Sequence, residues 1–334
     1  AIYYAESIER MAANLVDAQP DVFLGVPRVW EKIHAGLTAK LAEATGTKAR
    51  VAKWSREVGL AYHRARSNGE TPSAALRFKY NVAYKLLFGR IRAALGLSRG
   101  QVLLTGAAPI AADILQDLAG LDLPLREVYG QTEGSGPTTH NRALASRWGS
   151  AGLPFMGIEL KIEEDGEILM RSDAVFQGYF KDPEATAEVL KDGWLHTGDL
   201  GYLDGDGYLF VTGRKKEIII TAGGKNISPR NIEEGVKTHS LVTEAVVIGD
   251  RRRFLSVLVC VDPEAAIPSD LAKAQIWEHV ERLNQNLSKV EQIKKIAVLP
   301  EPMTVEGGEL TPTLKLKRNV IAAKYKKEID ALYA

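Results

Sequence analysis

The segment from Asp192 to Arg230 reads DGWLHTGDLGYLDGDGYLFVTGRKKEIIITAGGKNISPR and contains eight glycines. Short apolar stretches alternate with these glycines, which is typical of short strands joined by tight turns. The same segment carries three lysines, two arginines, four aspartates and one glutamate. Glycine lets the backbone approach a ligand closely, and Arg or Lys beside it can bind phosphate. The segment therefore predicts a turn-rich β structure close to a phosphate-bearing ligand.

Composition is that of an ordinary globular protein. The chain has 334 residues, enough for two domains, with 45% apolar and 25% charged residues. Its net charge of +1 gives no indication of a nucleic-acid partner. The single cysteine, Cys260, lies in the apolar run LSVLVCVD, and we expect a buried strand residue there. One cysteine forms neither a disulfide framework nor a thiolate metal cluster, which favours a reducing, cytoplasmic location.

The start of the chain reads as the middle of a domain. No apolar run approaches the roughly 20 residues that span a bilayer. The first residues, AIYYAESIERM, lack an initiating Met and the layout of a signal peptide. We therefore expect the chain to begin within a domain.

The first hundred residues have helical periodicity. After Val26-Pro27-Arg28, apolar residues recur every three or four positions, and interrupted helical patterning continues to about Leu97. Basic residues dominate the polar face, which we interpret as a solvated surface. These residues are Arg64, Arg66, Arg77, Lys79, Lys85, Arg90 and Arg92.

The next region alternates strand and helix. VLLTG (102–106) and EVYG (127–130) read as short strands that end in glycine, and helix-like AADILQDLAG lies between them. This order predicts a parallel α/β layer, in which ligands collect at the carboxyl ends of the strands.

Hairpins and a smaller domain follow. Asp165-Gly166 and Asp206-Gly207 are strong hairpin-turn signals, and Ser228 and Pro229 predict a helix N-cap and first helical residue. The strands EAVVIGD and FLSVLVCVD precede helices expected near 272–287 and 320–332. The predicted class is α/β. We expect a domain boundary at 214–217, between an α/β domain with a β-hairpin subdomain (1–213) and a small α+β domain (218–334).

Several polar residues in these turns can serve a nucleotide. In VYGQTEGSG, Tyr129 offers a ring that can stack on a purine, and Thr132 and Glu133 offer oxygens suited to Mg²⁺. Asp199, after a glycine, suits ribose hydroxyls or a local backbone cap. Arg214 suits a phosphate clamp or a surface ion pair. We interpret His196 as structural.

Three motifs in this order, YGQTE, WLHTGD with GRKKEIIITAGGKNISP, and LTPTLKLKR, resemble the AMP-binding, adenylate-forming superfamily. Within it, PRVWEKI (27–33) and LTPTLKLKR resemble long-chain fatty-acyl-CoA synthetases. The resemblance covers nearly the whole chain. It implies ATP, Mg²⁺ and coenzyme A as reactants with a long-chain fatty acid. The carboxylate attacks the α-phosphorus of ATP, and the CoA thiol then displaces AMP from the acyl-adenylate.

The resemblance also implies roles for individual residues. Gly106, Ala107, Ala108, Tyr129 and Gly130 line the nucleotide pocket, Thr132 contacts phosphate, and Glu133 holds Mg²⁺. Asp199 binds the ribose hydroxyls, and Arg214 lies near ribose and phosphate. It further implies that 1–213 is the C-terminal part of the large N-terminal domain, that 214–217 is a hinge containing the hinge residue Lys216, and that 218–334 is a small mobile domain. In that domain, Gly223 and Gly224 line the pantetheine channel.

The catalytic lysine has two candidates. Aligning Thr311 with the family's T-x-S-G-K pattern selects Lys315 and keeps the following arginine at Arg318, although Thr313-Leu314 replaces Ser-Gly. Starting at Thr313 selects Lys317 but loses the hydroxyl and the arginine. We expect Lys315 to stabilise charge on the α-phosphate, with Lys317 as the alternative.

One family element is missing from the sequence. We find no Ser/Thr/Gly-rich loop ending in Pro-Lys-Gly, which wraps the β- and γ-phosphates in the family. We therefore expect the C-terminal portion of a synthetase that binds AMP or CoA but adenylates poorly by itself. An adenylating ligase for another acid and a non-catalytic nucleotide- or acyl-CoA-binding relative stay open. So do the oligomeric state and a peripheral membrane contact.

Overall fold

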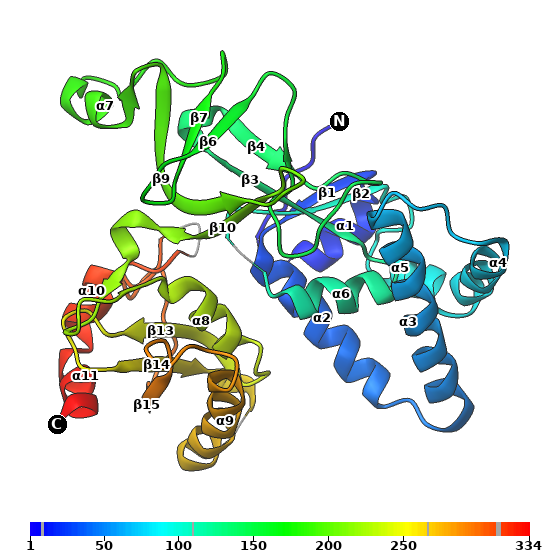
Figure 1. Cartoon of the computed structure of the whole chain (residues 1–334). Coiled ribbons are helices and arrows are strands. Elements are labelled where there is room, and N and C mark those ends of the chain that lie inside the picture. Colours follow the sequence, from blue (N-terminus) through cyan, green and yellow to red (C-terminus); the bar gives the residue numbers. More distant parts are fainter. Residues whose placement is uncertain (8–9, 109, 266, 312–314) are drawn as a thin grey trace. The chain divides into compact units, whose positions relative to one another are not determined.

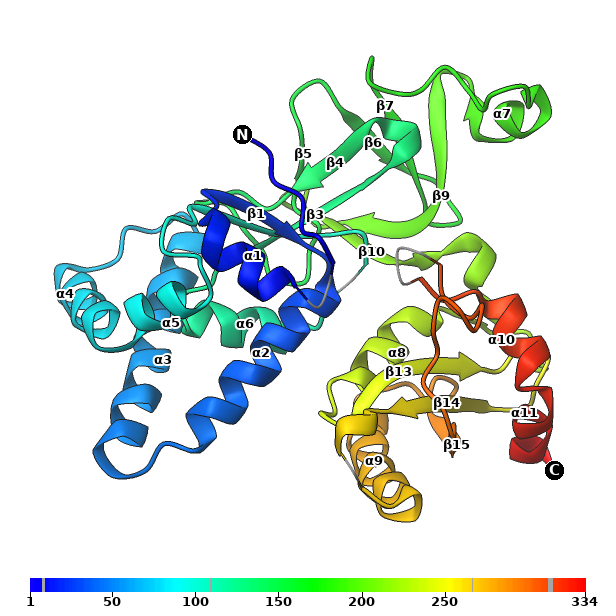
Figure 2. The ribbon, with the colours of Figure 1, turned by 180° about the vertical axis from the view of Figure 1, so that it is seen from behind.

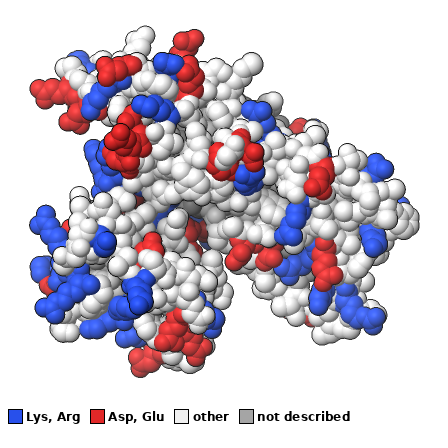
Figure 3. Space-filling view, viewed as in Figure 1, with Lys and Arg blue, Asp and Glu red and all other residues white. Residues whose placement is uncertain are grey.

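The computed structural model describes residues 1–334 except 8–9, 109, 266 and 312–314. The chain forms two compact units, Ala1–Val211 and Thr212–Ala334 (Figure 1). On the face drawn in Figure 3, basic and acidic side chains are interspersed on both units. Among the described residues, no helix is long and apolar enough to cross a membrane.

A five-stranded sheet organises the first unit. Strands β1 (Val22–Gly25), β2 (Val102–Thr105) and β3 (Leu125–Gln131) are parallel, and β4 (Gly136–His140) and β5 (Leu153–Pro154) continue antiparallel. The expected parallel pair, VLLTG and EVYG, is confirmed. Since β1, β2 and β3 run the same way, the loops after β2 and β3 leave the sheet in the same direction.

Helices cover this sheet and enclose the core of the unit. In α2 (Pro27–Ala42), the apolar face predicted from the spacing places Trp30 at 0% exposure, and its indole N–H donates to the Leu104 carbonyl at 3.0 Å. Figure 1 shows α2 beside α6. The other helices are α1 (Met11–Ala18), α3 (Gly46–Ser67), α4 (Ala74–Ala83), a π-helical turn (Tyr84–Phe88), α5 (Gly89–Ala94) and α6 (Ala112–Gly120).

A second sheet is built from hairpins, and its strand β10 runs across the division between Val211 and Thr212. Its path is β10-β9-β7-β6, and β8 pairs with β9. Gly166 and Gly207 have φ values of 87° and 83° in the turns that join these strands, so both predicted Asp-Gly turns are confirmed. The elements are β6 (Glu159–Ile162), β7 (Glu167–Arg171), α7 (Pro183–Val189), β8 (Leu190–Lys191), β9 (Trp194–Leu203) and β10 (Leu209–Arg214).

The second unit is an α+β domain. Its three-stranded sheet has two packed faces, because alternate residues of β14 enter two separate apolar cores and Cys260 is fully buried in one of them. Figure 2 shows α8 and α9 apart from α10 and α11. The elements are β11 (Ile219–Ile220), β12 (Asn226–Ile227), α8 (Pro229–Lys237), β13 (Val242–Ile248), β14 (Leu255–Val261), α9 (Ser269–Asn284), β15 (Ile293–Val298), α10 (Arg318–Lys324) and α11 (Lys326–Tyr333).

Ser228 and Pro229 take the N-cap and first helical positions of α8 as predicted, although the Ser228 hydroxyl donates to the Thr212 carbonyl at 2.5 Å and makes no capping bond to the helix. Two expectations need correction. The single helix expected over 320–332 is interrupted at Tyr325, which separates α10 from α11. Arg92 is not on a solvated face: it is 9% exposed and its guanidinium donates to the Asp122 carbonyl at 2.7 Å.

Candidate nucleotide site

The loop after β2 carries the first expected pocket residues. A Cβ on Gly106 would lie 2.6 Å from a methyl carbon of Val128, so only glycine fits against β3 here. Ala107 has φ = 71°, a left-handed conformation that costs a non-glycine residue about 1–3 kcal/mol. Ala107 and Ala108 are exposed. The loop is therefore closely packed at its base and accessible beyond it.

Tyr129 and Asp199 meet although they lie 70 residues apart in the sequence. The Tyr129 hydroxyl donates to Asp199 Oδ2 at 2.9 Å. Asp199 is 3% exposed, and its backbone N–H donates to the Thr197 hydroxyl at 3.1 Å. In this structure Tyr129 thus occupies a carboxylate oxygen that a ribose hydroxyl is expected to use.

Glu127 is a further candidate site residue, which the sequence reasoning missed. Because side chains alternate along a strand, Glu127 and Tyr129 point to the same face of β3. Burial raises the pKa of Glu127 to about 8, although a hydrogen bond from the Gly149 N–H (3.0 Å) partly opposes this rise. A carboxyl group that is mostly protonated at pH 7 can both donate and accept hydrogen bonds. In the sequence, the position of Glu127 two residues before Tyr129 on the same strand is the signal that could have identified it.

Glu133 lies in a short 3-10 turn, Thr132–Gly134, that follows β3. The Tyr179 hydroxyl donates to Glu133 Oε1 at 2.8 Å, while among the described residues Oε2 has no hydrogen-bond or ion-pair partner. Burial and this contact raise the pKa of Tyr179, so it remains a donor. The arrangement leaves one hard oxygen suited to Mg²⁺. In the described part of the chain, no three His, Cys, Asp or Glu side chains form a metal cluster.

Gly130 is required by the β3–β4 hairpin. A Cβ there would lie 2.0 Å from the Gly136 carbonyl oxygen. The glycine therefore holds the two strands close together between Tyr129 and the turn that carries Thr132 and Glu133. Thr132 is exposed at this turn.

The remaining expected residues belong to the second unit. Arg214 ends β10 and is exposed, and Lys216 lies in the short 3-10 turn Lys215–Glu217. Gly223 and Gly224 form the exposed turn between β11 and β12, where Gly224 has φ = 71° and its N–H donates to the Thr221 carbonyl at 2.8 Å. Their proximity to the residues of the first unit stays a prediction.

The loop that carries Lys315 and Lys317 (the lysine loop, residues 309–318) has hydrogen-bonded ends. The Lys315 N–H donates to the Thr311 hydroxyl at 2.9 Å, and the Lys315 side chain is exposed, as is that of Lys317. Glu309, 1% exposed, accepts hydrogen bonds from Lys324 and Tyr325. Burial alone would raise the pKa of Glu309, but these hydrogen bonds lower it to about 2. Thr313 and Leu314 lie outside the described residues.

Comparison with known proteins covers almost the whole chain. Residues 2–180 match the family model of the AMP-binding enzymes, and residues 216–334 match that of the AMP-binding enzyme C-terminal domain. A long-chain-fatty-acid–CoA ligase, FadD15 of Mycobacterium bovis, is 37% identical over 99% of this chain and 57% of its own length. The ligase ACSBG2 of Xenopus laevis is 38% identical over 97% of this chain and 49% of its own length. The chain thus spans about half the length of these relatives.

A solved structure supports the fold. The adenylation domain of a carboxylate reductase from Mycobacterium chelonae matches with a TM-score of 0.73 at 23% identity, over 98% of this chain and 48% of that one. The predicted α/β fold class is confirmed.

Proposed function

The chain belongs to the AMP-binding enzyme family, and we propose that the protein containing it is an ATP-dependent long-chain fatty-acid–CoA ligase. In the first step the fatty-acid carboxylate attacks the α-phosphorus of ATP and pyrophosphate leaves. In the second, the CoA thiol displaces AMP and acyl-CoA forms. Relatives at 37% and 38% identity with this name support the substrate class. Because the chain spans about half their length, the proposal concerns the whole protein.

The observation that carries the proposal is the contact between Tyr129 and the buried Asp199. A ribose hydroxyl can replace the Tyr129 hydroxyl on the carboxylate, which frees the ring to lie against the base. Glu127, on the same face of β3, can accept a hydrogen bond from the amino group of adenine and donate one to a ring nitrogen. These three side chains would together recognise both the sugar and the base of AMP.

The phosphates require positive charge and metal. Glu133 would hold Mg²⁺ through Oε2, and Thr132 would contact a phosphate oxygen. Bound Mg²⁺ neutralises charge on the phosphate oxygens of ATP. Lys315 would meet the charge that builds on the α-phosphate, and Arg214 would lie near the ribose and phosphate.

The turn at Gly223 and Gly224 would serve the second step. It presents backbone with no side chain in the way, which suits the narrow pantetheine arm of CoA. Lys216 would be the residue about which the second unit changes position between the steps.

The test measures AMP release that depends on ATP, Mg²⁺, palmitate and CoA, in this chain and in a version extended upstream. We expect activity in the extended version alone. There, Lys315→Ala should lower adenylation about 100-fold or more while AMP affinity changes little, and Lys317→Ala is the matched control. A larger loss in Lys317→Ala would transfer the role to Lys317.

Two outcomes would contradict the ligase proposal. Activity with an aryl or short acid but not with palmitate would indicate an adenylating ligase for another acid. AMP binding without activity on any acid would indicate a non-catalytic relative.

A further inference from the structure

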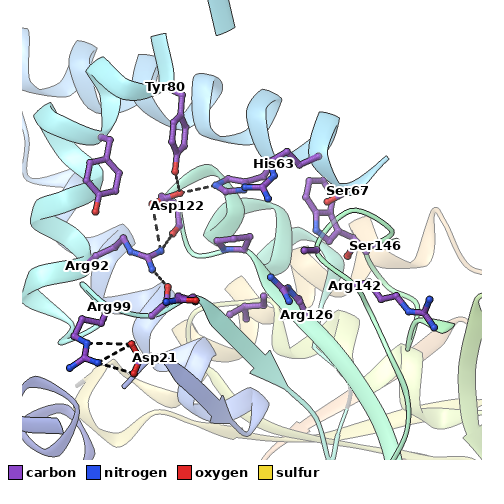
Figure 4. A pocket seen from close by; sticks show the side chains of 18 of the residues that line it. Asp21, His63, Ser67, Tyr80, Arg92, Arg99, Asp122, Arg126, Arg142 and Ser146 are labelled. Atoms are coloured by element: carbon purple, nitrogen blue, oxygen red, sulfur yellow. Dashed lines mark hydrogen bonds and ion pairs between the residues drawn. The ribbon is translucent and has the colours of Figure 1, made fainter. Parts of the chain in front are cut away.

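A cavity of about 580 Å³ lies in the first unit (Figure 4). Its volume falls within the roughly 300–1,000 Å³ of small-molecule sites. It is lined from α3, from the helical segments that follow α3, from the start of β3 and from the loop after β4. The charged lining residues are Asp21, Arg66, Arg92, Arg99, Asp122, Arg126 and Arg142, and His63 also lines the cavity. The five arginines and two aspartates together carry a formal charge of +3.

Both lining aspartates already pair with other residues of the cavity. Figure 4 shows Asp122 between Arg92, His63 and Tyr80. Asp122 Oδ1 lies 2.8 Å from His63 Nε2 and accepts the Tyr80 hydroxyl at 2.6 Å, and Oδ2 lies 3.5 Å from Arg92 Nη1. Asp21 pairs with Arg99 at 3.0 Å in the same way. These contacts use the negative charge of both aspartates.

Three arginines remain without a neutralising carboxylate. Among the described residues, no Asp or Glu lies within ion-pair distance of Arg66, Arg126 or Arg142. Arg142 donates to the Pro154 carbonyl at 3.0 Å, and Arg66 lies over the Tyr62 ring at 5.9 Å. Burial lowers the pKa of Arg126, and the positive charge of Arg66 lowers it further. Like charges gathered in a half-buried site repel one another, and a bound anion would remove that repulsion.

The cavity is distinct from the candidate nucleotide site. Arg126 and Glu127 are consecutive in β3, so their side chains point to opposite faces of the strand. Glu127 lies on the face of Tyr129, and Arg126 lies on the other. In addition, Asp21, Gln101 and Pro124 precede the parallel strands β1, β2 and β3, whereas the nucleotide loops follow β2 and β3.

We propose that this cavity binds a phosphate-rich anion, such as an organic polyphosphate. Guanidinium groups donate paired hydrogen bonds that match phosphate oxygens, and Arg66, Arg126 and Arg142 offer three such groups. The hydroxyls of Ser67, Ser98 and Ser146 line the same cavity and add donors. The volume exceeds that of a single phosphate, and Trp148 provides a ring against which an organic part can pack.

The experiment titrates sodium tripolyphosphate into the natural full-length protein that contains this chain, by isothermal titration calorimetry at low salt and with saturating AMP. AMP keeps the nucleotide site occupied. We expect one-to-one binding that weakens about tenfold or more in Arg66→Gln/Arg126→Gln, and that weakens as salt is raised. Arg126→Lys keeps the charge without the paired donors, and its affinity should be intermediate.

Arg90→Gln is the matched control, because Arg90 is exposed and does not line the cavity. Its affinity should stay within about twofold of the wild type. The double variant should melt no lower than the wild type without ligand, since it removes like-charge repulsion.

Equal binding in wild type and double variant would overturn the proposal. So would binding by the 334-residue chain but not by the full-length protein, because another segment would then fill the cavity. Acyl-CoA synthesis, measured in the same variants, tests the proposed function separately.

Discussion

At the scale of single residues, the hydrogen bond between Tyr129 and Asp199 must break before ribose can use the carboxylate. Tyr129→Phe removes this competing bond and keeps the ring, so AMP should bind equally well or up to about tenfold more tightly, as one hydrogen bond contributes about 0.5–1.5 kcal/mol. Asp199→Asn should weaken AMP about tenfold or more. Calorimetric titration with AMP measures both. If both variants lost AMP affinity to a similar extent, the Tyr129 hydroxyl would contribute to AMP binding and would not compete with it.

Glu127 provides a prediction about pH. Its pKa is about 8 in the folded protein, against an ordinary value of 4.5, because partial burial disfavours the charged carboxylate. Between these values the folded state binds more protons than the unfolded state. The stability contributed by the protonated carboxyl is thus fully present below pH 4.5 and is lost as the pH rises through 8.

Glu127→Gln stays neutral at every pH and should therefore become more stable than the wild type as the pH rises. The difference in the free energy of unfolding should grow from near zero at pH 5 to at most about 5 kcal/mol above pH 8. Urea unfolding at several pH values measures it. A difference that does not change with pH would contradict the raised pKa.

The sequence predicts which residue types matter better than it predicts which residues meet. Tyr129 and Asp199 stand out in separate motifs, but their contact depends on the packing of two sheets. The sequence does not single out Glu127, because its altered chemistry comes from burial, which a single sequence does not show. The helical pattern places Arg92 on a solvated face, because it does not reveal that Asp122, a residue with φ = 64°, pairs with Arg92.

At the scale of helices and strands, local signals were the most successful. The Asp-Gly turns and the buried strand with Cys260 depend on a few neighbouring residues, and each is confirmed. The break at Tyr325 was not predicted, because no Gly or Pro marks it. Its buried ring instead follows from packing, and its hydroxyl donates to Glu309 at 3.0 Å.

The ion pair between α8 and α10 gives a prediction at this scale. Arg318 donates to both carboxylate oxygens of Glu233, at 2.8 and 2.7 Å, and Glu233 is 5% exposed. Burial would lower the pKa of Arg318, but these hydrogen bonds raise it. Arg318→Ala leaves a buried carboxylate without its partner and should destabilise the second unit by about 3–5 kcal/mol.

Thermal or denaturant unfolding measures this loss. Lys326→Ala is the control, since it removes an exposed ion pair with Asp330 within α11 and should cost less than about 1 kcal/mol. If the two substitutions lowered the free energy of unfolding equally, the pair between α8 and α10 would contribute no more than an exposed ion pair. It would then not hold the end of the lysine loop.

At the scale of the whole molecule, the chain divides between Val211 and Thr212, close to the expected hinge at 214–217. Both units contain residues that the proposed reaction needs: Asp199 and Glu133 in the first, and Lys315 and Gly224 in the second. Two half-reactions with different reactants would use these sets in turn. The proposal therefore requires the second unit to change position between the steps, and Lys216 is the residue expected to permit it.

Proline at Lys216 tests this requirement. Lys216 is exposed in a 3-10 turn, and the usual φ of such turns, about −50 to −70°, includes the −65° that proline imposes, so Lys216→Pro should fold. In a version extended upstream, one half-reaction should be retained while the other slows about tenfold or more, because proline prevents the change in φ at this residue. Single-turnover pyrophosphate release measures adenylation, and acyl-CoA formation from supplied acyl-adenylate measures transfer.

Lys216→Ala removes the charge but keeps the backbone rotation, and both rates should stay near those of the wild type. If proline slowed both half-reactions equally, Lys216 would have a folding role, and the hinge would have to lie elsewhere.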